Sequence, residues 1–230
     1  MKKIFSVIAI VVVIVLQSGL LAACKAENYE SGDGEYSNMV AEFADTYTTA
    51  EKTLTRMMTD EGDSLVFADK YLCDWAATAD SVFRALVYYN KVAGGKADVL
   101  SVHQVLVPVI RPHYTVKEIK TDPVVIESSW KSHNNRYLNF RLNLLSGTIE
   151  GMDNRHLVGM MCDTLLTHAD GRQHLHLRLF HNQNGVPEYY GYQAYLSIPL
   201  KTNPYRLHTG DTVSVRVNTY EGEVQKTFIY

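Results

Sequence analysis

The sequence has little of what marks specialised classes of protein. It contains three cysteines and six prolines in 230 residues, which excludes peptide-scale disulfide scaffolds and collagen-like or low-complexity chains. A basic excess is also missing, because 22 lysines and arginines stand against 25 acidic residues, a formal net charge of −3. Binding to nucleic acid usually needs such an excess, so nucleic acid is not an expected partner.

The residues that are abundant indicate a folded chain rich in strands. Hydrophobic residues make up 46% of the sequence, enough for one large domain or two small ones. The 15 tyrosines outnumber the 7 phenylalanines and 2 tryptophans together, and β-sheets favour tyrosine. Composition by itself points to no particular activity.

The N-terminus has the pattern of an export signal. Lys2 and Lys3 precede an apolar-leaning run from Ile4 to Leu16, which matches a secretory signal in charge and length. The alternative is a transmembrane helix, which needs roughly 20 apolar residues. Gln17-Ser18-Gly19 interrupts the run before that length is reached, so the secretory signal is favoured.

A lipobox follows this run. Leu21-Ala22-Ala23-Cys24 places a branched apolar residue and two small residues before a cysteine, and small side chains fit the narrow cleft of the signal peptidase. The Cys24 thiol is the group that receives diacylglycerol before cleavage. We therefore predict a lipoprotein signal peptide at residues 1–23, lipidation at Cys24 and a polar, lipidated tether at residues 24–35.

The lipid predicts a membrane location without a spanning segment, since two acyl chains suffice for stable anchoring. Lys25 stands where many lipoproteins retained in an inner membrane have aspartate, so we expect an outer-membrane lipoprotein, on the periplasmic side or at the cell surface. Glu27 and Glu30 faintly resemble an acidic signal for export to the surface.

Alternation with a period of two dominates residues 36–120, where we expect a first domain of about five strands. Two β-prone runs flank the turn Asp60-Glu61-Gly62-Asp63, which is typical of a hairpin. One short helix is expected around Tyr71–Ala79, and a loop at Asn90–Gly95. The predicted strands are Met39–Ala44, Thr53–Met58, Ser64–Phe67, Val82–Tyr89 and Val99–Val107.

A second group of strands follows Asp122-Pro123, where the proline favours extended backbone in the residue before it. Seven β-prone runs at regular spacing, with turns that contain glycine, are typical of an antiparallel sandwich. We therefore expect a second domain at residues 121–230. The runs are Val124–Trp130, Tyr137–Leu145, Leu157–Thr167, Gln173–Phe180, Tyr189–Leu200, Thr212–Tyr220 and Val224–Tyr230.

The sequence also predicts a register for one hairpin. Asp170-Gly171 is typical of a two-residue type I′ turn, and this turn places an opposite-charge pair directly across the strands, which supports the register. It also places Cys162 among leucines, as a buried structural thiol. The predicted cross-strand pairs are Leu166–Leu175, Thr164–Leu177, Cys162–Leu179, Thr167–His174, Leu165–His176 and Asp163–Arg178.

Cys73 and Cys162 are the two cysteines that remain after lipidation. An oxidising compartment makes a disulfide between them possible. The favoured alternative is two separate buried thiols, because the residues are far apart in sequence. Their spacing fits no metal site.

These features together resemble the NigD-like lipoproteins of the Bacteroides group, over most of the mature chain. The resemblance implies an all-β protein, with an N-terminal OB-like barrel followed by a C-terminal antiparallel β-sandwich. The chain departs from the family pattern in its tether, which lacks a dense aspartate run, and in the added stretch at Tyr71–Ala79. The resemblance supplies no functional residues. It is carried by the lipobox at Cys24, by Asp60-Glu61-Gly62-Asp63, and by Thr121-Asp122-Pro123-Val124-Val125-Ile126, Arg136-Tyr137-Leu138-Asn139-Phe140 and His174-Leu175-His176-Leu177-Arg178-Leu179.

Two histidines are the strongest hint of chemistry. His174 and His176 lie two residues apart on a predicted strand and so share one face, as paired zinc ligands do in some sites. The favoured alternative is a solvated strand face, because the predicted cross-strand neighbours, Thr167 and Leu165, are not metal ligands. We expect no metal site and no cofactor.

Other catalytic patterns are missing from the sequence. There is no Gly-x-Ser-x-Gly elbow, and Gly94-Gly95 has neither the spacing nor the lysine of a phosphate loop. An aromatic platform for sugars or peptides is one interpretation of the cluster Tyr189-Tyr190-Gly191-Tyr192 together with the run Leu138–Asn143. Packing on a strand face is the favoured alternative, and we predict no catalytic residue.

The sequence therefore predicts a non-enzymatic envelope lipoprotein, a β scaffold that binds a protein or glycan partner at the outer membrane. Protection against a secreted toxin is one specific form, suggested by the bacteriocin-associated gene cluster from which the NigD-like family takes its name. The alternative function is a metal-dependent hydrolase that uses His174 and His176.

Overall fold

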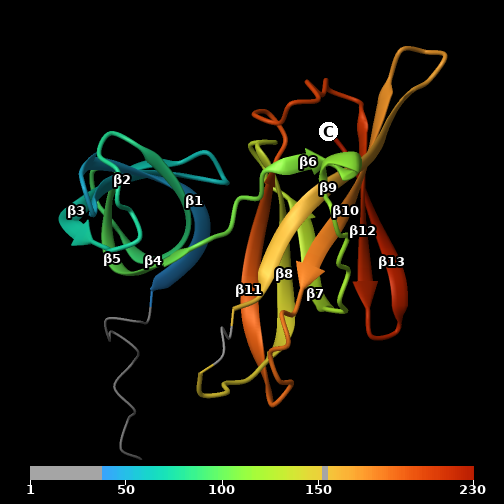
Figure 1. Ribbon diagram of the computed structural model, residues 1–230. Coiled ribbons are helices and arrows are strands. Elements are labelled where there is room, and N and C mark those ends of the chain that lie inside the picture. Colours follow the sequence, from blue (N-terminus) through green and yellow to red (C-terminus); the bar gives the residue numbers. More distant parts are fainter. Residues whose placement is uncertain (1–37, 152–154) are drawn as a thin grey trace, which may run out of the picture. The chain divides into compact units, whose positions relative to one another are not determined.

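The computed structural model describes residues 38–151 and 155–230 (Figure 1). Most of the segments with alternating apolar and polar residues form β-strands in it. The one helix in these two ranges is a 3₁₀ turn, η1, at His113–Thr115. None of the helices described is long and apolar enough to cross a membrane. The predicted signal peptide, the lipidation site Cys24 and the tether at residues 24–35 lie outside the described residues.

The first five strands close into a barrel in the order β1-β2-β3-β5-β4 (Figure 1), which confirms the predicted OB-like barrel. Its interior is filled by large side chains such as Leu54, Met57 and Tyr89 together with several alanines. The loop predicted at Asn90–Gly95 is shorter, because β4 continues to Val92. The strands are β1 (Met39–Ala50), β2 (Thr53–Thr59), β3 (Ser64–Leu72), β4 (Val82–Val92) and β5 (Lys96–Gln104).

The prediction of a helix around Tyr71–Ala79 is wrong. The stretch finishes β3 and then forms turns and bends. Its carbonyl groups accept hydrogen bonds from the β1–β2 hairpin: the Lys52 amide donates to the Ala76 carbonyl at 2.7 Å, and the Thr48 hydroxyl donates to the Thr78 carbonyl at 2.7 Å. Tyr71 and Leu72 pair with Leu54 and Thr53 of β2, so the backbone groups that would form the first turn of the expected helix are used in the sheet instead.

Each of the seven runs predicted after Asp122 contains a strand, and together they form a sandwich. A five-stranded sheet has the order β13-β12-β10-β9-β6, and a three-stranded sheet has the order β11-β8-β7. The three-residue strand β6, which includes Pro112, was not predicted from the sequence. The strands are β6 (Ile110–Pro112), β7 (Val125–Lys131), β8 (Tyr137–Ser146), β9 (Leu157–Thr167), β10 (Gln173–Asn182), β11 (Tyr190–Pro199), β12 (Thr212–Thr219) and β13 (Gly222–Ile229).

The expected antiparallel pattern of the sandwich holds for most of its pairings, and two pairings need correction. Strands β10 and β12 are parallel, as are β6 and β9. The β10–β12 pair is parallel because β11, which separates them along the chain, belongs to the other sheet. The chain therefore returns to the five-stranded sheet in the direction of β10.

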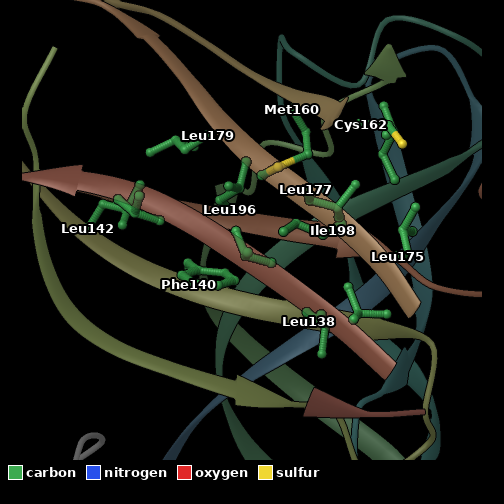
Figure 2. Packing of buried hydrophobic residues seen from close by; sticks show 14 of the residues in the cluster. Leu138, Phe140, Leu142, Met160, Cys162, Leu175, Leu177, Leu179, Leu196 and Ile198 are labelled. Carbon is green, nitrogen blue, oxygen red and sulfur yellow. The ribbon is translucent and has the colours of Figure 1, made fainter. Parts of the chain in front are cut away.

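The two sheets of the sandwich bury one face each against the other (Figure 2). Strand β8 shows the expected alternation, with Leu138, Phe140, Leu142 and Leu144 all at most 1% exposed. The aromatic ring of Phe140 also packs edge-on against Phe228. Burial of so many large apolar side chains makes this core the main stabilising feature of the C-terminal part of the chain.

The register predicted for the β9–β10 hairpin is wrong by one residue. His174 lies opposite Leu166, because the loop has three residues rather than two. The Gly171 amide donates to the His168 carbonyl, and the His168 amide donates to the Arg172 carbonyl. Only Gly171 has a positive φ, of 83°, as in a type I turn followed by a left-handed residue.

A bulge at Asp163 shifts the same hairpin by one further residue, so that Cys162 lies opposite Leu177. Two consequences of the predicted register survive this shift. Cys162 is buried among the leucines of the core, and the Asp163 carboxylate accepts hydrogen bonds from Arg178 at 3.1 Å. The bulge explains the ion pair, because it turns Asp163 toward Arg178 although the two are not directly paired.

Cys73 and Cys162 are both free thiols, so the alternative of two separate cysteines holds. Cys162 is buried, whereas Cys73 is only half-buried rather than fully buried as expected. Burial raises the pKa of both thiols, and an additional side-chain hydrogen bond joins Cys162 to Tyr205. Both cysteines are therefore structural rather than activated groups.

Candidate functional site

A network of buried polar side chains joins the barrel to the sandwich. Arg84, on β4, donates to the Asp60 carboxylate at 2.6 Å and to the Ser197 hydroxyl of β11 at 3.1 Å. Asn139, on β8, donates to the same Asp60 oxygen at 3.0 Å and accepts from Ser197 at 2.7 Å. All four residues are less than 9% exposed. The charge of Arg84 is thus compensated by Asp60 and, at 3.6 Å, by Asp45 in the barrel part, while the sandwich adds neutral hydrogen-bond partners.

Aromatic rings surround this network. The Arg84 guanidinium lies 4.0 Å from the ring centre of Tyr137, and Phe43 packs edge-on against Trp130 and Tyr195 at 5.3 and 5.6 Å. Burial, with the nearby Asp45 carboxylate, raises the pKa of Tyr137 to about 12. This hydroxyl therefore stays protonated near neutral pH.

The sequence does not predict this network. Asp60 belongs to a turn pattern and Asn139 to a strand pattern, and neither pattern points to Arg84. The one signal available was an arginine inside the β-prone run Val82–Tyr89, where a charge on a strand with buried neighbours needs a partner. The sequence could not identify that partner, because Arg84 and Ser197 are 113 residues apart.

A cleft of about 1120 Å³ opens beside the network. Its apolar lining includes residues that are well exposed, such as Leu106, Leu157 and Tyr192 at 44%, 50% and 49%. Large exposed apolar side chains in a concave surface are typical of a binding site. The described lining residues are Val82, Phe83, Arg84, His103, Gln104, Val105, Leu106, Val107, Leu142, Leu144, Ser146, Arg155, His156, Leu157, Val158, Phe180, Tyr190, Tyr192, Gln193, Ala194, Tyr195 and Leu196.

The tyrosine cluster has a different position from the one favoured by the sequence analysis. Tyr189, Tyr190 and Tyr192 are 74%, 54% and 49% exposed, so they do not pack as a buried strand face, and two of them line the cleft. The run Leu138–Asn143, in contrast, is largely core and supplies only Leu142 to the cleft. The exposed tyrosines are compatible with the platform interpretation, which stays a prediction, whereas most of the Leu138–Asn143 run packs on a strand face as the favoured alternative expects.

The histidines on β10 lie on the outer face of the five-stranded sheet. His174 and His176 are stacked with ring centres 3.8 Å apart, and the His174 imidazole shares a hydrogen bond of 2.8 Å with the Ser214 hydroxyl. Their cross-strand neighbours are Leu166 and Thr164, not the predicted Thr167 and Leu165. Within the described residues, no group of three or more histidine, cysteine or acidic side chains is placed to hold a metal ion.

A second histidine pair lies at the margin of the cleft. His156 and His181 share a hydrogen bond of 2.9 Å between ring nitrogens, and His181, 2% exposed, also bonds to the Asp122 carbonyl at 2.9 Å. Burial lowers the pKa of His156, and the neighbouring His181 lowers it further. A neutral His156 is therefore favoured near neutral pH. The pair anchors the segment around Asp122 to β10.

Solved structures share the fold of this chain. A NigD-like immunity protein from Bacteroides caccae has a TM-score of 0.62 at 21% identity, covering 83% of this chain and 96% of its own. A putative toxin-related protein from Parabacteroides distasonis gives 0.61 at 21% identity, covering 84% and 93%. A putative lipoprotein from Bacteroides fragilis gives 0.54 at 8% identity, covering 83% and 96%. At these identities the likeness concerns the fold alone.

Sequence comparison is more specific. No curated protein matches the chain significantly. The sequence model of the NigD-like C-terminal β-sandwich domain matches residues 107–230, a range that takes in all the strands of the sandwich from β6 to β13. Because this match covers more than half of the sequence, the chain belongs to the NigD-like family.

Proposed function

We propose that this protein is a lipid-anchored scaffold of the outer membrane that binds a protein partner and catalyses no reaction. The observation that carries the proposal is the cleft, which exposes Leu106, Leu157 and Tyr192 beside a rigid, buried network. A concave apolar surface held in place by buried hydrogen bonds is suited to binding. Support for a protein partner also comes from the relatives described as an immunity protein and as toxin-related.

A protein partner fits the cleft better than a glycan does. Sugar rings are lined with hydroxyl groups and need many polar partners, whereas the described lining is dominated by leucine, valine and aromatic side chains. Removal of such side chains from water contributes roughly 25 cal/mol per Å², from which the entropic cost of association is subtracted. Protection of the envelope against a secreted protein toxin is one function of this kind.

The anchor is part of the proposal. Residues 1–23 act as the signal peptide, Cys24 carries the lipid and residues 24–35 form the tether between the membrane and the domains at 36–120 and 121–230. Cys24→Ser is expected to abolish membrane fractionation and to leave unprocessed precursor, because no thiol remains to accept the lipid. Retention of a lipid label by this variant would contradict the proposal.

The partner is tested by crosslinking in living cells. A photoreactive amino acid at Tyr192, inside the cleft, is expected to capture a discrete protein of the cell envelope or of a competing strain. The matched control is the same amino acid at Tyr114, which is 80% exposed and lies outside the cleft. A captured species that resists protease would indicate a glycan partner instead, and identical capture at both positions would contradict a specific site.

A further inference from the structure

The edges of the β-sheets in this chain are protected unequally. A strand at the edge of a sheet presents unpaired backbone groups, and proteins usually cover such edges with charged residues or proline. The barrel has no edge because it is closed. In the sandwich, three edge strands carry charged residues, whereas β11 (Tyr190–Pro199) carries none and has a proline only at its last residue. The protecting residues are Arg111 and Pro112 on β6, Glu127 and Lys131 on β7, and Glu223 and Lys226 on β13.

The outer edge of β11 is paired at one position only. The Leu106 amide donates to the Tyr195 carbonyl at 3.1 Å, and the Ser197 amide donates to the Leu106 carbonyl at 2.9 Å. Among residues 38–151 and 155–230, no other residue pairs with this edge. Backbone groups alternate in direction along a strand, so Gly191 and Gln193 point the same way as Tyr195 and lack a strand partner.

This unpaired edge lies in the cleft. Residues from both faces of β11 line the cleft, with Tyr192 and Ala194 on the face toward the core and Gln193 and Tyr195 on the opposite face. The free stretch from Tyr190 to Ala194 is about as long as an average strand of five or six residues. An extended segment in the cleft would therefore continue the pairing that Leu106 begins.

The cleft selects the kind of segment. Its described lining has Arg155 at the surface and no acidic residue, although acidic residues outnumber basic ones in the whole chain. The charge of the other lining arginine, Arg84, is already compensated by Asp60. An uncharged or acidic segment is complementary to such a lining, and a basic one is not. A second copy of the chain is the other possible occupant, and the crosslinking below identifies it if it binds.

We infer that the β11 edge binds an extended, apolar to acidic segment of the protein partner as an added β-strand. The added strand would pair with the backbone of Gly191 and Gln193 and place alternate side chains against Tyr192 and the apolar lining. Main-chain bonds supply affinity and side-chain pockets supply specificity in this mode of recognition. The inference rests on the proposed function, because it concerns how the same partner is held.

The test combines crosslinking at Tyr192 with a backbone change at Gln193. Gln193→Pro removes the outward amide, and proline is tolerated on an edge strand. Gln193→Ala is the matched control, because it changes the side chain and keeps the amide. We expect Gln193→Pro to reduce capture of the partner roughly tenfold or more relative to Gln193→Ala, since an acceptor of the partner is left unpaired.

Two further measurements separate the outcomes. Thermal unfolding shows whether Gln193→Pro is folded, and hydrogen exchange on the captured wild-type complex reports the Gly191 and Gln193 amides, which are expected to become protected. Equal capture by folded Gln193→Pro, or unprotected amides in the complex, overturns strand addition while the proposed binding function stands. If Gln193→Pro is unfolded, the exchange result alone decides. Capture of a second copy of the chain, or of nothing, overturns the inference and the proposed function together.

Discussion

The barrel and the sandwich differ in how they pair the edges of their strands. Both bury one face of alternating strands, but the barrel closes on itself and so has no unpaired strand. The sandwich keeps two open sheets and four edge strands, of which β11 alone lacks charges. The barrel interior also relies on small residues, including Ala44, Ala76, Ala85 and Ala97, whereas the sandwich core is rich in leucine.

The difference shows where an extended partner can be accepted. A closed barrel offers no backbone groups for pairing, so an added strand can only join the sandwich. The barrel contributes walls to the cleft through Val82 and His103, and it contributes Arg84 to the network that holds the cleft together. The family match covers the sandwich, and the proposed binding edge belongs to it as well.

The largest expected effect comes from breaking the link between the two regions. Arg84→Met leaves the buried Asp60 carboxylate without its cation, which costs about 3–5 kcal/mol in buried ion pairs. Chemical denaturation should show a loss of this size, because the network involves both regions. Separate unfolding transitions for barrel and sandwich in the variant would sharpen the comparison further.

The control for this change is Lys91→Met. It breaks the ion pair between Lys91 and Asp63, whose side chains are 53% and 50% exposed. Ion pairs that are exposed to this extent contribute about 0–1 kcal/mol to the free energy of unfolding. A similar loss of unfolding free energy in both variants would mean that the buried ion pair of Arg84 stabilises the protein no more than an exposed one. The link between the two regions would then not depend on this network.

The next effect is confined to the sandwich. Gly171→Val is expected to lower the free energy of unfolding by more than about 1 kcal/mol, because a β-branched residue is strained at a φ of 83°. An added Cβ meets no atom within 4 Å, so the loss reports backbone strain rather than a clash. Gly171→Asn is the control and should lose less, since asparagine tolerates this conformation. Equal losses would contradict the three-residue turn.

Acid should also distinguish the two regions. Burial tends to raise the pKa of Asp163, but hydrogen bonds from Arg216 and Arg178 outweigh it and hold the pKa below its ordinary value of 3.8. A carboxylate of this kind stabilises the fold above the ordinary pKa, and its contribution is lost as the pH falls through the lowered pKa. Asp163→Asn should therefore destabilise the sandwich at pH 7 and weaken its loss of stability below pH 3.8.

The measurement for Asp163 is denaturant unfolding at several pH values from neutral to strongly acidic. Asp98→Asn, an exposed change on the barrel strand β5, serves as the comparison and should keep the acid dependence of the wild type. Equal pH dependence of Asp163→Asn and the wild type would show that Asp163 does not contribute to acid unfolding.

The smallest effect is expected on the outer face of the sandwich. His174→Ala removes one hydrogen bond to Ser214 and should cost no more than about 1 kcal/mol in unfolding free energy. Ser214→Ala tests the same bond from its other end. A loss of several kcal/mol from His174→Ala alone would mean that this face is packed like the core and that the contrast between the two faces of β10 is wrong.

Local pattern determined most of the fold. The alternation of Leu138, Phe140 and Leu142 with polar residues predicted a half-buried strand, because side chains on a strand point to opposite faces in turn. Regular spacing of seven such runs predicted the sandwich, and the runs before residue 120 predicted five strands. The lipobox at Cys24 is a local pattern too, and the prediction drawn from it needs no tertiary structure.

Tertiary structure decided what depends on distant partners. Tyr71 and Leu72 pair with β2 as the end of β3 instead of beginning the expected helix. One extra loop residue at Ala169–Gly171 changed every cross-strand pair of the β9–β10 hairpin. The hydrogen bond between Arg84 and Ser197 joins residues that only the folded chain brings together. Sequence alone determined which residues form strands, because that depends on neighbours along the chain. Only the fold decided which edge stays open, because that depends on which strands lie side by side.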